Sequence, residues 1–121
     1  MKSDESGAAA QQRQFYRAPV DFPVNAIIEV ETESARAHDL SGAGIRISME
    51  RMLDRGQALE LRFHLSGGTS ELRAHGIVVL SFFEGSTQLY HHGIAFTRIG
   101  AGDREAIVHY IHDVQRRSLH S

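Results

Sequence analysis

No cysteine occurs among the 121 residues of this sequence, and only one of its 13 cationic residues, Lys2, is a lysine. The lack of cysteine excludes disulfides, thiolate metal sites and a cysteine nucleophile, and it is compatible with a reducing compartment. No apolar run approaches the length that is needed to span a bilayer. Residues 1–7 also lack the apolar stretch of a secretory signal, so we expect a cytoplasmic protein without membrane insertion.

The charge of the chain is nearly balanced, with a net value of -2 at pH 7. A domain that binds duplex nucleic acid is usually clearly basic, so the balance argues against a general polyanion binder. The bias toward arginine can arise in two ways. It reflects either codon usage in a GC-rich genome or a need for the guanidinium fork, which pairs bidentately with phosphates and with the Hoogsteen edge of guanine. Only the positions of the arginines in the chain can distinguish these two explanations.

Most of the chain carries a β pattern. Its length fits one domain, and short apolar or alternating segments follow one another with turn residues between them. Gly76 lies inside the longest of these segments and is expected to mark a bulge. The predicted strands cover residues 25–33, 35–40, 45–48, 59–65, 72–83 and 89–99.

The period changes near the C-terminus. Apolar residues recur at helical spacing, at Ala106, Ile107, Tyr110, Ile111 and Val114. With Asp103 as a suitable N-cap, they predict a helix over residues 103–117. The predicted fold is therefore mostly β, a small six-stranded antiparallel barrel with a C-terminal α-helix packed on it. We expect this domain to span residues 13–117, between a mobile tail at 1–12 and a short tail at 118–121.

Residues 13–23 mix charge, three aromatic residues and both prolines of the protein, and they predict an arm or loop that leads into the first strand. Arg13 and Arg17 are four residues apart in this arm. Two guanidinium groups at this spacing could converge on one compact dianion. An arbitrary pair at this spacing is, however, more often two solvated side chains.

The run Asp39-Leu40-Ser41-Gly42-Ala43-Gly44 lies between two predicted strands. The Asp39 carboxylate is an acceptor suited to the N1–H and N2–H₂ donors of guanine, and the Ser41 hydroxyl can donate and accept. Gly44 has no side chain, so a ligand could approach its backbone closely. The competing interpretation is an ordinary hairpin turn, for which these residue types are also expected.

The eight histidines and the serines form no recognisable catalytic or metal pattern. His91 and His92 are adjacent in a predicted strand and face opposite sides, while His109 and His112 have no acidic partner that completes a known metal motif. We expect surface histidines and no metal site. No Gly-x-Ser-x-Gly elbow and no phosphate-binding P-loop occur, so we expect no enzyme. Exposed aromatic residues are too few for a single-strand nucleic-acid platform.

The order of the two candidate motifs resembles the PilZ domain family. In this sequence the family's Arg-x-x-x-Arg corresponds to Arg13 and Arg17, and its Asp-x-Ser-x-x-Gly corresponds to Asp39, Ser41 and Gly44. The lead-in at residues 17–24 and the closing strand at Gly93-Ile94-Ala95-Phe96 are similar as well, so the resemblance extends from Arg13 to Val114.

The resemblance implies a barrel that binds cyclic di-GMP, with the two arginines on phosphates and guanine edges and the Asp-Ser-Gly run on the base. Gln12 stands at the position that tends to affect whether one ligand or a stacked pair binds, which leaves the stoichiometry open. The expected protein is a stand-alone adaptor, without a cofactor, that orders its arm over residues 12–21 and signals to a protein partner in motility or biofilm control. It would be a monomer or a ligand-linked dimer. The alternatives are a ligand-independent interaction module of the same fold and a small-barrel nucleic-acid binder.

Overall fold

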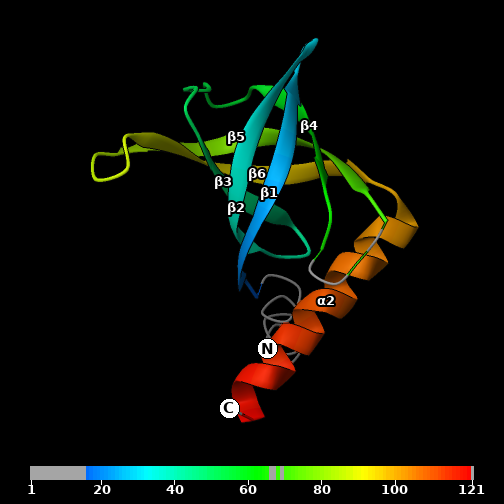
Figure 1. The fold of residues 1–121 in the computed structure, drawn as a ribbon. Helices are drawn as coiled ribbons and strands as arrows, with labels where there is room; N and C mark the ends of the chain where they lie inside the picture. The colour runs from blue at the N-terminus through cyan, green and yellow to red at the C-terminus, as the bar shows by residue number, and fades with distance from the viewer. Residues whose placement is uncertain (1–15, 66–67, 69, 121) are drawn as a thin grey trace, which may run out of the picture.

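The computed structural model describes residues 16–65, 68 and 70–120, with side chains described up to residue 117. Six antiparallel strands form a closed barrel in the order β1-β2-β3-β6-β5-β4, and one helix follows them (Figure 1). The elements are β1 (Ala18–Ile28), β2 (Glu31–Leu40), β3 (Gly44–Met49), β4 (Ala58–Phe63), β5 (Leu72–Glu84), β6 (Leu89–Ile99) and α2 (Ala101–His120). The predicted fold class, mostly β with six strands and a C-terminal helix, is confirmed.

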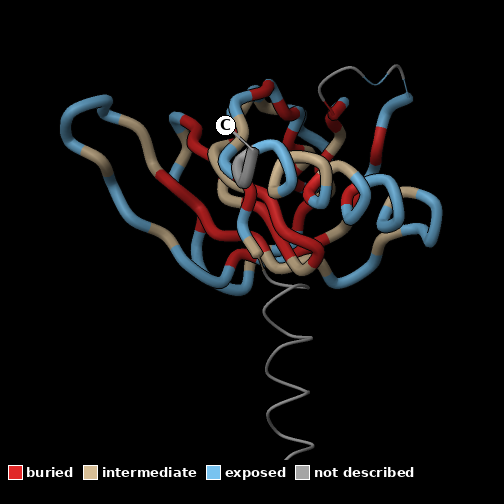
Figure 2. The backbone as a smooth tube through the Cα atoms, turned by 90° about the horizontal axis from the view of Figure 1, so that it is seen from below, coloured by how far each residue is buried: buried red, intermediate tan, exposed pale blue. Residues whose placement is uncertain are grey.

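The core fills the inside of the barrel because the strands alternate between inward apolar and outward polar residues. In β4, Leu59, Leu61 and Phe63 are buried, whereas the side chains between them are partly exposed. Burying one large apolar side chain stabilises a fold by roughly 1.5–3 kcal/mol, so this alternation decides which face of the strand turns inward. Figure 2 shows the buried segments gathered at the centre, within a rim of exposed turns.

The first strand begins earlier than the sequence predicts. Residues 18–23 were expected to belong to a loop or arm, yet β1 starts at Ala18, which is fully buried and pairs with Leu40 of β2. Pro19 and Pro23 precede the pairing of β1 with β4, which starts at Val24. In this part of the strand one edge has no partner strand among the described residues, so a missing N–H is tolerated.

The predicted strand over residues 25–33 is divided by a turn. β1 ends at Ile28 and β2 begins at Glu31, with Glu29 and Val30 between them. Glu29 has a φ of 58° and Val30 is 94% exposed. A left-handed residue at such a turn is usually glycine, and its absence here hid the hairpin from sequence analysis.

Strands β5 and β6 are long and extend beyond the barrel as a two-stranded hairpin, which projects at the left of Figure 1. Their pairing shifts register between His75 and Gly76, so the predicted bulge occurs at Gly76, with Thr97 of β6 as the extra residue. A Cβ on Gly76 would lie 2.7 Å from the carbonyl oxygen of Ala95, which explains why glycine occupies this position. The register shifts again between Val78 and Leu80.

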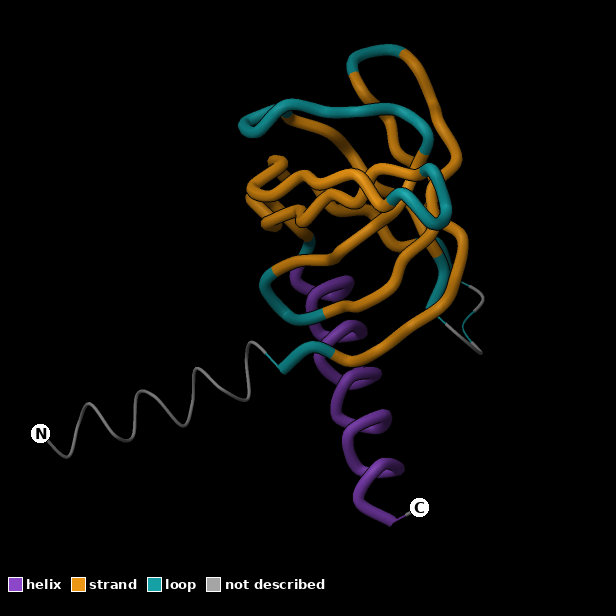
Figure 3. Tube along the Cα trace, turned by 90° about the vertical axis from the view of Figure 1, so that its left-hand side faces the viewer, coloured by secondary structure: helices purple, strands orange, loops and turns teal. Residues whose placement is uncertain are grey.

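Helix α2 begins at Ala101 and continues to His120, so it is longer at both ends than the predicted helix. Asp103 is not its N-cap; the backbone N–H of Arg104 bonds to the carbonyl of Gly100, and Asp103 lies in the first turn. Ile107 and Ile111 are buried and dock the helix on one end of the barrel (Figure 3). Among the described residues no helix is apolar enough over a sufficient length to cross a membrane.

Candidate ligand-binding site

The two sequence motifs meet in space at Arg17 and Asp39. Arg17 directly precedes β1, and Asp39 is near the end of β2, where the antiparallel register places Pro19 opposite it. Nη1 of Arg17 donates a hydrogen bond to Oδ1 of Asp39 at 2.6 Å. Arg13 and Gln12, the other predicted residues of this segment, lie outside the described residues.

The Asp39 carboxylate is held by a second arginine, Arg46 of β3. Nε of Arg46 donates to Oδ2 of Asp39 at 2.8 Å, so each carboxylate oxygen accepts a bond from a different guanidinium. The Asp39 side chain is 19% exposed, and those of Arg17 and Arg46 are 54% and 32% exposed. The arrangement is an accessible, positively charged cluster on the outer wall of the barrel, in which the acidic group is already oriented.

Arg46 was not predicted from the sequence, although a signal for it exists. Asp39 and Arg46 are directly opposite each other in the β2–β3 hairpin. Residues 45–48 alternate, so the apolar residues of β3 face the core and Arg46 faces outward. Cross-strand pairs of opposite charge stabilise a sheet by roughly 0.2–1 kcal/mol, and fixing the hairpin register would have revealed this one.

A chain of polar contacts continues from Arg46 to β6 and β5. Nη1 of Arg46 lies 2.7 Å from Nδ1 of His91, and Nε2 of His91 lies 3.2 Å from Oε1 of Glu84. Because an arginine can only donate, Nδ1 of His91 accepts and the proton of the neutral ring is on Nε2, facing Glu84. Hydrogen bonds from Thr87 and His91 lower the pKa of the Glu84 carboxyl, so it stays ionised as an acceptor.

The histidines on β6 are not surface residues, which corrects the prediction. His91 is 4% exposed and His92 is fully buried. They do face opposite sides, since Nδ1 of His92 bonds to the Ser81 hydroxyl and its Nε2 lies 3.0 Å from the carbonyl oxygen of Arg51. Each buried ring therefore has partners for both nitrogens. In the part of the chain that the structure describes, no three metal-ligating side chains cluster together.

Ser41 is buried and its hydroxyl is committed to the turn between β2 and β3. Oγ accepts hydrogen bonds from the backbone N–H groups of Ala43 and Gly44, both at 3.1 Å. The backbone N–H of Ser41 also bonds to the carbonyl of Gly44 at 2.8 Å. The side chain shapes the segment that follows Asp39, and the residue is 1% exposed.

Gly44 has a packing reason to be glycine. It is the first residue of β3 and pairs with Ala95 of β6, and a Cβ on it would lie 2.2 Å from the carbonyl oxygen of Ile94. The sequence predicts that a ligand approaches this backbone. The structure shows that a neighbouring strand already does so.

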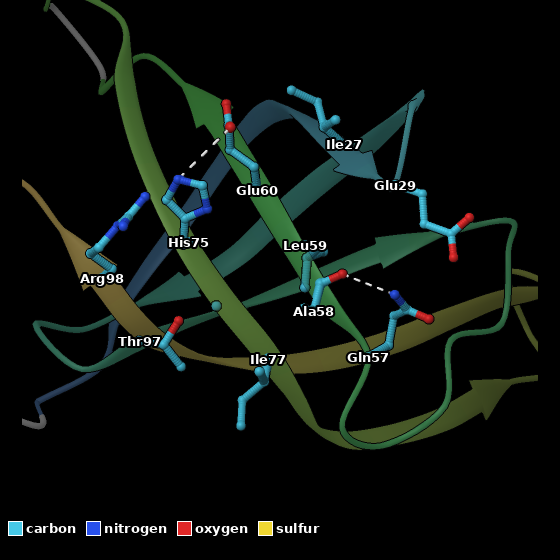
Figure 4. Close-up of a pocket in the computed structure, with 11 residues that line it drawn as sticks. Ile27, Glu29, Gln57, Ala58, Leu59, Glu60, His75, Ile77, Thr97 and Arg98 are labelled. Atoms are coloured by element: carbon cyan, nitrogen blue, oxygen red, sulfur yellow. Dashed lines mark hydrogen bonds and ion pairs between the residues drawn. The ribbon is translucent and has the colours of Figure 1, made fainter.

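Two hollows on the barrel lie away from this cluster. One of about 620 Å³ is on the outer face of β4, β5 and β6, where Glu60, His75 and Arg98 line it (Figure 4). The other, of about 640 Å³, is lined by residues of β2 and β3 that include Arg36, His38 and Ser48. Neither of these two hollows is lined by Arg17 or Asp39.

The fold and the site define a class of small β-barrel domain with an arginine-rich site on its outer wall. The PilZ domain family model matches residues 11–113, nearly the whole chain, and the chain belongs to the PilZ domain family. The resemblance noted from the sequence is thereby confirmed. No curated protein sequence matches the chain.

Solved structures share the fold at low sequence identity. The inhibitor of motility MotI/DgrA of Bacillus subtilis is 21% identical with a TM-score of 0.76, over 89% of this chain and 52% of that one. The PilZ domain of YcgR from Escherichia coli, solved with c-di-GMP, is 13% identical with a TM-score of 0.65, over 89% and 95% of the two chains. PlzA of Borreliella burgdorferi in complex with c-di-GMP is 16% identical with a TM-score of 0.62, over 91% and 45%. This chain thus spans about half the length of MotI and PlzA.

Proposed function

We propose that this chain is a cytoplasmic receptor for cyclic di-GMP, not an enzyme. The observation that carries the proposal is the pair Arg17–Asp39, in which the two family motifs meet on the outer wall of a PilZ barrel. Family membership supports it, as do two neighbours of the same fold whose structures contain c-di-GMP. Cyclic di-GMP is a dianion with two guanines, and the cluster offers groups for both parts.

In the proposed complex each charged group has a distinct role. Asp39 accepts hydrogen bonds from the N1–H and N2–H₂ edge of a guanine, which only an ionised carboxylate can do through both oxygens. Arg17 turns toward a phosphate or a guanine O6/N7 edge, and we expect Arg13 to do the same. Arg46 keeps its bond to Oδ2 of Asp39 and so fixes the plane of the carboxylate.

Breaking the Arg17–Asp39 bridge to admit the ligand is inexpensive. An exposed ion pair contributes about 0.2–1 kcal/mol, and Arg17 is more than half exposed. A hydrogen bond to a charged group contributes about 1.5–3 kcal/mol where the partner is held in place. Replacing the Arg17–Asp39 bridge by contacts with the ligand is therefore favourable. In the absence of ligand, the bridge keeps both side chains near their binding positions.

Ser41 and Gly44 act through the turn in this proposal. The hydroxyl of Ser41 is occupied by two backbone N–H groups, so its contribution is to hold the backbone of residues 41–44 in the shape that faces the ligand. Gly44 permits the close pairing of β3 with β6 that places Arg46 next to His91. Any direct ligand contact at this turn would come from the backbone.

The segment that we propose to become ordered on binding is shorter than the segment predicted from the sequence. Residues 18–21 are already part of β1, and Tyr16 packs partly buried against the core. The rest of the predicted arm, residues 12–15, lies outside the described residues. Its ordering upon binding, and the signal that this would give to a protein partner, stay predictions.

Isothermal titration with c-di-GMP tests the proposal, with GTP and GMP as competitors. We expect saturable binding that prefers c-di-GMP, and a loss of at least tenfold in affinity for Arg13→Ala, Arg17→Ala or Asp39→Ala, since about 1.4 kcal/mol corresponds to a factor of ten. Arg62→Ala is the matched control, because Arg62 forms a similar ion pair with Glu60 on β4. Equal affinity for GTP, or unchanged affinity in all three site variants, would refute a dedicated site.

A further inference from the structure

The projecting end of β5 exposes apolar side chains on both of its faces. Val79, Leu80, Phe82 and Phe83 are 43%, 51%, 44% and 53% exposed. Phe82 stacks on His91, and Phe83 packs against Tyr90. Tyr90 and His91 are consecutive residues of β6, so their side chains point to opposite faces. Together the two phenylalanines expose about as much area as one fully exposed phenylalanine residue. Residues 79–83 therefore expose a few hundred Å² of apolar area, divided between the two faces of the strand, and we call these residues the β5 patch.

The β5 patch also has an open backbone edge. Strand β4 pairs with β5 only as far as Ile77, and the N–H and C=O of Val78 bond to Gln57 and Gly56. Among the described residues, 79–83 have backbone partners on the β6 side alone. Exposed edges are usually blunted by charged residues or proline, and residues 79–83 contain neither.

The sequence of the patch is complementary to itself. In an antiparallel pairing of two copies centred on Ser81, Val79 of one copy is opposite Phe83 of the other, and Leu80 is opposite Phe82. Aromatic residues opposite β-branched or aliphatic ones are favourable cross-strand pairs, and no charged side chain within 79–83 opposes another. A two-fold axis at Ser81 satisfies the geometry of an isologous dimer, in which each contact occurs twice.

We propose that the β5 patch binds a second copy of this chain, with the two β5 edges joined into one continuous antiparallel sheet. The occupant is a second copy because the patch matches its own sequence, is uncharged and offers the backbone edge that strand addition requires. The patch is smaller than the roughly 800 Å² per partner of a standard stable interface, so the dimer is weak and depends on concentration.

Sedimentation equilibrium of the full chain tests whether the dimer forms. Variants that carry charges at positions 79 and 83 test its register. For the wild-type protein the average mass should rise toward twice the monomer mass between about 5 and 500 µM. The double variant Val79→Lys with Phe83→Lys should remain monomeric, as should Val79→Glu with Phe83→Glu, because each places like charges opposite one another. Mixing the two variants should restore a dimer, since every 79–83 pair then becomes an ion pair.

A matched control is Val30→Lys with Val108→Lys, which changes two exposed apolar residues elsewhere and should leave dimerisation unaltered. Circular dichroism shows whether each variant folds, and heterodimer formation by the mixture is itself proof of folding. A wild-type protein that stays monomeric over the whole range would overturn the proposal. So would a dimer that survives either double variant, because its interface would then lie elsewhere.

Discussion

Replacing Gly44 by alanine distinguishes a glycine required by packing from one required by a ligand. The added methyl group would be placed 2.2 Å from the carbonyl oxygen of Ile94, a backbone atom of the paired strand β6. Non-bonded atoms of this kind settle near 3.5 Å, so the strands must separate by about 1 Å. Neither strand can rotate the clash away, because both atoms belong to the backbone or are attached directly to it.

Overpacking a filled site destabilises a protein by about 1–3 kcal/mol. Because the displacement disturbs the hydrogen bonds of two central strands, we expect the upper part of this range, which corresponds to a decrease in Tm of about 10 °C for a domain of this size. Gly85→Ala is the control, since no heavy atom lies within 4 Å of the position that its Cβ would take and its φ is not positive. This control should change the stability by less than about 0.5 kcal/mol.

Urea unfolding of both variants, followed by far-ultraviolet circular dichroism without ligand, measures the difference directly. A free energy of unfolding that is lower for Gly44→Ala than for Gly85→Ala supports the packing role. Equal values would refute the reasoning and return Gly44 to the role of a ligand-approach site. Fully folded Gly44→Ala protein at low temperature should still bind c-di-GMP, but more weakly, because the shift also displaces Arg46 of β3 relative to its partner His91 on β6.

The remaining predictions concern three other positions. Arg46→Ala should weaken c-di-GMP binding about three- to tenfold, because it releases Oδ2 of Asp39. Titration should show that Arg46→Lys does not restore the affinity, since lysine lacks the fork that reaches both Asp39 and His91. Full affinity in the lysine variant would contradict this. Burial, helped by the neighbouring Arg46 charge, lowers the pKa of His38, so the unfolded chain binds that proton more readily than the folded one. Stability should therefore fall as pH drops below about 6.5, and His38→Gln should flatten this dependence in urea titrations at several pH values. Ile107→Ala should lower the free energy of unfolding by about 2–5 kcal/mol in thermal or urea melts, because the side chain docks α2 on the barrel.

The parts of the fold that could be predicted are those governed by local periodicity. Alternation in β4 and helical spacing in α2 predict burial correctly because each face meets the core in the same way along the element. Gly76 predicts its bulge because a glycine inside a strand weakens the strand and often marks a bulge or a close backbone approach. The turn at Glu29 was missed for the converse reason, since a non-glycine residue adopts the left-handed conformation there.

The site could be predicted only where it depends on residue type. Arg17 and Asp39 are identified by motif order, whereas Arg46 requires the register of a hairpin and His91 requires the neighbour order of the barrel. Arg46 and His91 are 45 residues apart and meet only because β3 pairs with β6. Their burial and bonding follow from tertiary pairing, which periodicity does not encode. The expectation of surface histidines failed at His91 and His92 for this reason.

Irregular pairing accounts for the positions of both the candidate site and the β5 patch. β2 is bulged between Ala37 and Asp39, and His38 is the extra residue. The His38 ring contacts the Ser48 hydroxyl, while the register brings Asp39 opposite Arg46. β5 is bulged between Val78 and Leu80, at the point where it leaves β4 and its edge opens. A bulge increases strand twist and redirects the side chains that follow it. Without the first, Asp39 would exchange sheet faces and lose both arginines. Without the second, Leu80 and Phe82 would continue the inward alternation of Val78 and would not add to the exposed apolar surface.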